Sequence, residues 1–278
     1  QWYNLLLWTI MLGLGNSICA NHYPSGDSFI PSQLAGLALW LPYNTGITAD
    51  QNAAGGSIDH STAEGNMEDE DKINAWNDSS GNAAHAQQST QAHKPLWETD
   101  SADIGGCNFT GTKYLDLART ITINANTDFT VVVRFKATNT DKNAFIGSSD
   151  QEFLRIQTSS KIRLKVNNLT NNNFDAPSGT IATDTYYTLI LTRSNGSTGT
   201  LNLYIRGGSY TTETGVEWTG GGTRPDGPIT ITNIGAQADN NEMWRGVLKD
   251  VIIYNSRAVT SDERKQLFDY VEGQTNPY

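Results

Sequence analysis

The segment DFTVVVRFK, residues 128–136, shows the pattern on which the prediction of the fold depends. Apolar side chains recur at every second position from Phe129 to Phe135, and the cationic Arg134 and Lys136 stand in the alternate phase. Successive side chains of a β-strand point to opposite faces of a sheet. The period of two therefore predicts a strand with its apolar face in a core.

Similar short segments follow along the rest of the chain. They are KIRLKV (161–166), YYTLILTR (186–193), LNLYI (201–205), ITITNIG (229–235) and VLKDVIIY (247–254). Turn-forming segments such as SNGSTG (194–199) and ADNNE (238–242) separate them. Short strands with turns between them are typical of an antiparallel sandwich or barrel. The absence of alternating helices and strands disfavours a doubly wound parallel sheet.

Signals outside this region fit the same fold class. The apolar run LALWL, residues 37–41, is a plausible first strand. A helix is predicted at the C-terminal end in SDERKQLFDYV, residues 261–271, because Thr260 and Glu263 together form a Thr-x-x-Glu capping box. The turn NDSSGN, residues 77–82, places a glycine where a positive φ angle is needed.

Composition limits the possible partners. The chain has 278 residues and a formal net charge of -10, and the length suits one large β domain. Because phosphate binding needs clusters of Lys and Arg, we expect no nucleic-acid partner. The four histidines have no zinc-ligand spacing. The only two cysteines, Cys19 and Cys107, are too few for a disulfide framework, although a bridge between them is possible.

Residues 50–72 are polar and contain the acidic run Glu68–Asp71, and we interpret them as a long surface loop. Calcium binding is the functional alternative, because Ca²⁺ prefers carboxylate oxygens. The spacing of an EF-hand loop is absent.

The chain opens with an apolar segment, QWYNLLLWTIMLGLGNSICANH (residues 1–22), which has no charged residue before His22. Its apolar core, from Leu5 to Leu14, is about half as long as a membrane span requires. No cation precedes the core as in a secretory signal, although SICANH imitates a cleavage site. We therefore predict an anchoring arm with a linker (residues 1–33), followed by one domain (residues 34–278).

An exposed apolar arm would promote aggregation, so its large side chains must pack against a surface. That surface is either the chain's own domain or a neighbouring subunit, and the second alternative makes the arm an assembly anchor. The candidate anchor residues are Trp2, Tyr3, Leu5, Leu6, Leu7 and Trp8.

Four segments together resemble a laminin-G-like, concanavalin A-like jelly-roll domain. They are LALWL (37–41), INAWNDSSGNAAHAQQ (73–88), KPLW with GGCNFTGTKYLDL (94–117), and IGAQADNNEMWRGVLKDVIIYNSRAVTSDERKQL (234–267). The resemblance implies an all-β fold of two antiparallel sheets packed face to face, with a short C-terminal helix. In addition, WYNLLL followed by LWLPYNTGIT is similar to virion structural proteins of marine tailed phages, especially cyanobacterial ones.

The resemblance gives Asp250 two alternative roles, because it matches an acidic position in the last strand of the family. It either hydrogen-bonds a turn or helps to hold a structural calcium ion, the only cofactor we consider. FTG (109–111) stands where the family often has Phe-Asp-Gly, so Thr110 puts a metal there in doubt.

Sugar binding needs an exposed aromatic platform near polar groups, and Trp218 and Tyr210 are candidates because turn residues surround them. The alternative is that each ring fills a gap under a loop. The cationic stripe Lys161, Arg163 and Lys165 can meet an anionic polysaccharide or simply form a solvated sheet face.

The functional expectation is a non-enzymatic virion protein, of the capsid or the tail, that displays a lectin-like sandwich to host glycans. Other virion proteins are the expected partners of the arm, and we expect homo-oligomers and no membrane span. The alternative is a free extracellular carbohydrate-binding module. Glycoside cleavage is disfavoured, because the acidic run at 68–71 lacks the apolar positions that would seat paired carboxylates on a core strand.

Overall fold

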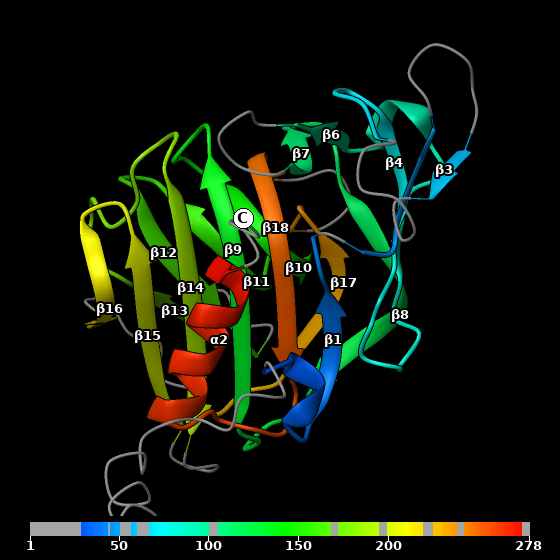
Figure 1. Cartoon of the computed structure of the whole chain (residues 1–278). Helices are drawn as coiled ribbons and strands as arrows, with labels where there is room; N and C mark the ends of the chain where they lie inside the picture. The colour runs from blue at the N-terminus through cyan, green and yellow to red at the C-terminus, as the bar shows by residue number, and fades with distance from the viewer. Residues whose placement is uncertain are drawn as a thin grey trace, which may run out of the picture. The chain divides into compact units, whose positions relative to one another are not determined.

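A computed structural model describes residues 29–43, 45–50, 57–59, 67–99, 105–167, 172–194, 199–218, 225–237 and 242–273. The chain divides into two compact units, residues 1–30 and residues 31–278. The second unit is an all-β sandwich with one α-helix near its C-terminal end (Figure 1). The predicted fold class is therefore confirmed. The anchor residues Trp2–Trp8 and Cys19 lie outside the described residues.

One layer, the front sheet, lies toward the viewer in Figure 1 and is antiparallel throughout. From edge to edge it contains β16 (Tyr210–Val216), β15 (Thr200–Gly207), β14 (Tyr186–Ser194), β9 (Phe129–Ala137), β18 (Arg245–Tyr254) and β1 (Leu37–Leu41). The predicted strand in DFTVVVRFK (residues 128–136) is thus β9, which lies next to the centre of this sheet.

The second layer, the back sheet, lies behind the front sheet (Figure 1). It contains β13 (Asn173–Asp175), β12 (Lys161–Lys165), β11 (Glu152–Gln157), β10 (Asn143–Ser149), β17 (Ile229–Ile234), β8 (Leu115–Ile123), β5 (Ala86–Gln87) and β4 (Lys72–Trp76). The hairpin partners β2 (Ile47–Asp50) and β3 (Ser57–Asp59) extend it beyond β4. The predicted loop at 50–72 thus contains the short strand β3.

Two strands connect the layers at one end of the sandwich. They are β6 (Leu96–Glu98), which pairs with β4, and β7 (Gly106–Thr110), which pairs with β6 and with the first part of β18. Through them all eighteen described strands form one continuous set of pairings. The two sheets therefore share one core.

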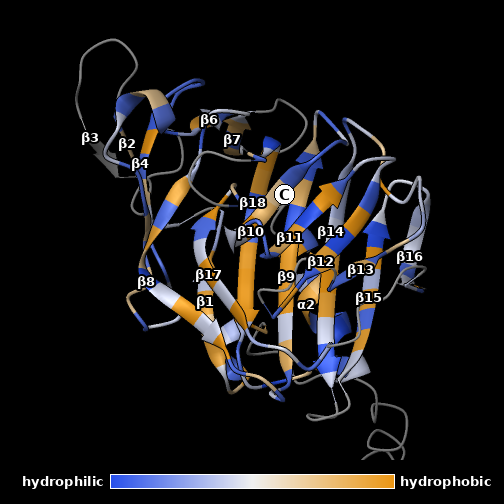
Figure 2. Ribbon diagram, turned by 180° about the vertical axis from the view of Figure 1, so that it is seen from behind, coloured by the Kyte–Doolittle hydropathy of each residue, from blue (hydrophilic) through white to orange (hydrophobic). Residues whose placement is uncertain are grey.

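Inward side chains of both sheets fill that core with apolar groups, which appear in orange along the strands in Figure 2. Phe135 on β9 lies 4.6 Å, between ring centroids, from Phe145 on β10. Trp244, before β18, packs 4.5 Å from Phe145. Trp76 is fully buried, and its indole N–H donates to the carbonyl of Pro42.

Helix α2 (Ser261–Gly273) covers the outer face of the front sheet over β9 and β14 (Figure 1). Its capping box is formed, since the Thr260 N–H donates to Glu263 Oε2 at 2.9 Å and the Glu263 N–H points back to Thr260 Oγ1 at 3.4 Å. Leu267, Phe268 and Val271 are buried against the sheet. Both faces of β9 are therefore buried, although its sequence alternates.

The free edge of β1 is covered by the predicted turn at residues 77–82. Asp78 Oδ1 accepts from the Trp40 N–H at 3.0 Å, and the Asn82 side-chain amide donates to the Leu37 carbonyl at 2.9 Å. Gly81 has the expected positive φ of 86°. Polar side chains of the turn thus form hydrogen bonds with backbone groups of β1 that an exposed edge strand would present to another chain.

Within the residues that the structure describes, no helix is long and apolar enough to span a membrane.

Candidate functional site

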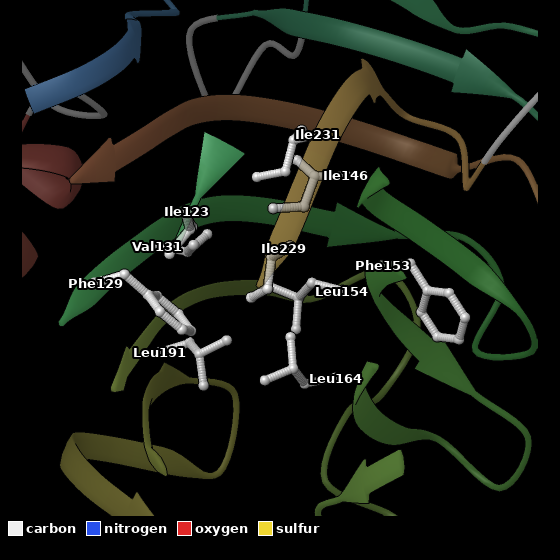
Figure 3. A pocket seen from close by; sticks show the side chains of 10 residues that line it. All are labelled: Ile123, Phe129, Val131, Ile146, Phe153, Leu154, Leu164, Leu191, Ile229 and Ile231. Atoms are coloured by element: carbon white, nitrogen blue, oxygen red, sulfur yellow. The ribbon is translucent and has the colours of Figure 1, made fainter. Parts of the chain in front are cut away.

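A cavity between the two sheets is too small for a ligand. The cavity there has a volume of about 10 Å³, which is at the lower limit for one water molecule. Figure 3 shows its walls, which consist of ten apolar side chains: Ile123, Phe129, Val131, Ile146, Phe153, Leu154, Leu164, Leu191, Ile229 and Ile231. A polar ligand finds neither room nor hydrogen-bond partners in this cavity.

The outer face of the front sheet carries a buried charged cluster beside α2. The Tyr186 ring has three cationic groups near it, and the nearest is Lys249 Nζ at 4.4 Å from the ring centroid. Arg134 donates to Thr188 Oγ1 at 3.0 Å and lies 3.6 Å from Glu272 of the helix. Lys136 forms an ion pair of 3.1 Å with Glu98 on β6.

Asp250 belongs to this cluster and is completely buried. Burial raises the pKa of its carboxyl group to about 7, although the charges of Arg134 and Lys249 and the backbone N–H of Tyr43 act in the opposite direction. Shifts of this size often mark functional groups. Here, however, the carboxyl has no exposed surface on which a ligand could reach it.

The fold leaves an open groove at the flank where β1 of the front sheet approaches β8 of the back sheet, and both views place these strands side by side (Figures 1 and 2). Its volume is about 320 Å³, within the range of small-ligand sites. Backbone and side chains of Gly36, Leu37, Ala38, Asn82, Ala84, Arg119, Thr120, Ile121, Thr122 and Asn255 line it. We call it the β1–β8 groove.

A bulge in β8 exposes the polar wall of the β1–β8 groove. In the pairing of β8 with β17, Asp116 lies opposite Asn233 and Ile121 lies opposite Ile231. Between these two pairs β8 has four residues, whereas β17 has one. The extra residues bow away from the sheet, as is usual at a β-bulge. Arg119 and Thr120 are consequently both exposed.

The opposite wall is fixed by close backbone contacts. Gly36 has a φ of +86°, and a Cβ at this position would lie 2.6 Å from Ser256 Oγ. Its carbonyl accepts from the Asn255 N–H at 3.0 Å. Because the Asn82 amide already donates to β1, the side chains left to a ligand are those of Arg119, Thr120, Thr122 and Asn255.

Arg119 determines the electrostatics of the groove. It is the one charged side chain among the described residues that line it. Arg119 Nη1 donates to the backbone carbonyl of Asn82 at 3.3 Å, and this bond holds the guanidinium next to another residue of the groove lining. A guanidinium has five N–H donors, so most of its capacity for hydrogen bonds is left for a ligand.

The structure does not bring the candidate sugar-binding rings into this groove. Trp218 is half-buried, packs against the core and against Phe174, and donates from its indole N–H to the Leu201 carbonyl at 3.1 Å. Tyr210 is also half-buried against the core. These positions resemble the gap-filling alternative, and ligand binding by these rings stays a prediction.

The cationic stripe on β12 is partly neutralised by one carboxylate, which two of its three cations share. Asp175 on β13 accepts from Arg163 through both oxygens, and Lys161 lies 2.8 Å from it. Lys165 donates to the backbone carbonyl of Asp150 at 3.0 Å. The stripe therefore offers an anionic polysaccharide less charge than its sequence indicates.

The surroundings of Asp250 are cationic, which does not favour a calcium ion at this position. In the described part of the chain, no group of three or more His, Cys, Asp or Glu side chains could hold a metal ion. Asp71, in the acidic run, instead accepts from the Glu68 N–H at 2.9 Å. Cys107 is buried with a free thiol, and burial raises its pKa.

Sequence reasoning missed Arg119, although a signal was present. In LDLARTITI, residues 115–123, every second position is apolar except the third, which is Arg119. A cation in the inward phase of a strand indicates either a buried ion pair or a bulge that turns the side chain out. The second explanation holds here.

Comparisons with known proteins place this fold. A laminin-G-type family model, described as the concanavalin A-like lectin/glucanases superfamily, matches residues 109–263. No curated protein matches the chain. Among solved structures, a GH54 α-L-arabinofuranosidase is similar with a TM-score of 0.52 and 17% identity over 89% of this chain and 61% of that chain.

Two further structures are less similar. A Trypanosoma rangeli sialidase has a TM-score of 0.45 and 15% identity over 96% of this chain and 39% of its own. Tailspike protein 2 of bacteriophage CBA120 has a TM-score of 0.41 and 13% identity over 66% of this chain and 30% of its own. The chain thus spans about three-fifths of the arabinofuranosidase and less of the other two.

The likeness to the arabinofuranosidase contradicts the expectation that the chain is not an enzyme. The arabinofuranosidase shares the fold over most of this chain, so the sandwich is an architecture that occurs in glycoside-cleaving enzymes. The lack of paired carboxylates in the run at 68–71 therefore does not exclude hydrolysis. The family itself is established by sequence: because its model covers more than half of the chain, the protein belongs to the concanavalin A-like lectin/glucanase superfamily.

Proposed function

We propose that this chain is a glycan-recognising sandwich domain of a virion, which attaches the particle to polysaccharide on a host surface. The observation that carries glycan binding is the β1–β8 groove, about 320 Å³ in volume and open to solvent. The resemblance of WYNLLL and LWLPYNTGIT to virion structural proteins supports the setting, and the free extracellular module is the alternative.

The groove suits a sugar because its walls combine two kinds of surface. Thr120, Thr122 and Asn255 present hydroxyl and amide groups that can both donate and accept hydrogen bonds. Leu37 and Ile121 contribute apolar atoms, which can lie against the C–H faces of a sugar ring. Few polar groups placed among apolar ones are typical of small-molecule sites.

The groove is also built on rigid elements, which reduces the entropic cost of binding. β1 is paired with β18, and β8 is paired with β17 on either side of the bulge that carries Arg119 and Thr120. The turn at residues 77–82 also fixes part of the lining, because the Ala84 N–H donates to Asp78 Oδ2 at 3.0 Å.

A glycan array followed by calorimetry on the full chain tests the proposal. We expect binding of at least one neutral or acidic polysaccharide class. The double variant Thr120→Val, Thr122→Val should bind roughly thirtyfold more weakly, because each of the two lost hydroxyls removes a hydrogen bond worth about 1 kcal/mol. The matched control is Thr212→Val, which alters an exposed threonine on β16 at the other edge of the front sheet.

Release of reducing sugar is measured in the same samples, because a bound glycan that is also cleaved would identify the groove as the substrate site. If no glycan binds to the wild-type chain, glycan recognition is refuted. If binding is found and the double variant matches the Thr212→Val control, the ligand lies elsewhere and the groove loses its assignment.

A further inference from the structure

We propose that the β1–β8 groove selects sugars that carry a carboxylate, and that Arg119 is the residue that binds this group. The inference rests on the proposed function, since it names the class of glycan that the same groove takes. It is argued from the position, the partners and the charge environment of Arg119.

The first step is that Arg119 is available to a ligand. Its side chain is exposed, and the hydrogen bond from its Nη1 to the Asn82 carbonyl is long at 3.3 Å. Within the part of the chain that the structure describes, no ion pair includes Arg119. The Asn82 contact orients the guanidinium without neutralising it.

The second step is a comparison with the other arginines. The formal net charge of the chain is -10, so carboxylates outnumber cations, and six arginines of the described residues form ion pairs with acidic side chains. Arg193, like Arg119, bonds to backbone carbonyls, but it is fully buried and therefore inaccessible to a ligand. Arg257 bonds to Glu263, Arg163 to Asp175, and Arg264 to Glu213 at 2.7 Å. An arginine left with a backbone carbonyl in a groove is therefore suited to a negative group brought by a ligand.

The third step is the chemistry of the anion. A guanidinium presents parallel N–H groups that match the two oxygens of a carboxylate, and such bidentate pairs are among the stronger hydrogen bonds. Thr120 and Thr122 lie on the same strand and can accept or donate to the ring hydroxyls of that sugar. A uronic acid unit combines these two features, a carboxylate beside vicinal hydroxyls.

The presence of a single cationic side chain in the groove lining also limits the class of ligand. Polyphosphates and nucleic acids require several cations along their backbone. A single Arg119 instead suits one carboxylate within a largely neutral sugar surface.

The test uses the full chain and oligosaccharides of glucuronic, mannuronic and galacturonic acid, each beside its methyl ester. The ester keeps every hydroxyl group and removes the charge. We expect the wild-type chain to bind at least one acid about tenfold more tightly than its ester, and Arg119→Gln to lose this preference. Arg119→Lys should retain a reduced preference, because lysine keeps the positive charge but lacks the parallel N–H donors of the guanidinium.

The control variant is Arg245→Gln, which removes an exposed arginine at the start of β18, outside the residues that line the groove. It should keep the preference for the acid, and the melting temperatures of all variants should match, which excludes unfolding as the cause of a loss.

The two proposals fail in different ways. Equal binding of every acid and its ester, or a preference that Arg119→Gln leaves unchanged, would overturn the assignment of Arg119 while glycan binding stands. Absence of binding to any glycan, acidic or neutral, would overturn the proposed function as well.

Discussion

Asp250 shows what a single buried carboxyl group does to the stability of this sandwich. It has no exposed surface and lies near Arg134 and Lys249, yet burial outweighs both charges and raises its pKa to about 7. In the unfolded chain an aspartate titrates near 4. Between these two values the folded protein therefore holds a proton that the unfolded chain has already lost.

This difference predicts that the free energy of unfolding falls as the pH rises from about 4 to about 7, and then levels off. We expect the wild-type chain to lose on the order of 2 kcal/mol between pH 5 and pH 8 from this group, since one unit of pKa shift corresponds to about 1.4 kcal/mol. Asp250→Asn should lack this component when unfolding in urea is measured across the same pH range.

The matched control is Asp141→Asn, which replaces an exposed carboxylate and should keep the wild-type pH dependence. Identical slopes for the wild type and Asp250→Asn would show that the carboxyl is not protonated in the folded state near neutral pH.

At the scale of an element, the turn at residues 77–82 protects the edge strand β1. Asp78 accepts four hydrogen bonds: from the backbone N–H groups of Trp40, Ser80 and Ala84 and from the Ser80 hydroxyl. The same turn carries Asn82, whose carbonyl orients Arg119. The turn at residues 77–82 therefore both covers the edge of β1 and forms part of the wall of the β1–β8 groove.

We therefore expect Asp78→Ala to lower the free energy of unfolding by about 3 kcal/mol, because it leaves several N–H groups without a charged acceptor. Ser80→Ala, which removes only the hydroxyl, should cost about 1 kcal/mol. Urea denaturation of both variants checks the order. Equal losses would mean that water replaces the Asp78 carboxylate at the edge of β1.

At the scale of the whole molecule, residues 31–278 form a compact unit with its own core. If the apolar segment at the N-terminal end serves assembly, its removal should not disturb that core. We predict that deletion of residues 1–22 leaves the melting temperature of the domain unchanged and abolishes its incorporation into particles.

A full-length variant with Leu5→Asp and Leu7→Asp provides the control, because it keeps the length of the segment and removes its apolar character. Both variants should be missing from purified particles by mass spectrometry. Particles that still contain the truncated chain would disprove an anchoring role of the segment.

The sequence by itself determined the local elements. The period of two in residues 129–136 predicts β9, the capping box at Thr260 and Glu263 predicts the start of α2, and Gly81 marks the turn beside β1. These features depend on neighbours within a few positions, where backbone geometry links residue order to the direction of each side chain.

Only the tertiary structure decided which faces are covered and where a ligand finds room. Trp40, in the predicted first strand, lies on the outer face beside Tyr270 of α2, with ring centroids 6.0 Å apart. The β1–β8 groove joins Leu37, Arg119 and Asn255, which are far apart in the chain. The physical reason is that burial and clefts depend on which surfaces, distant in the sequence, come into contact. The hydrophobic periodicity of one strand does not indicate which element packs against its other face.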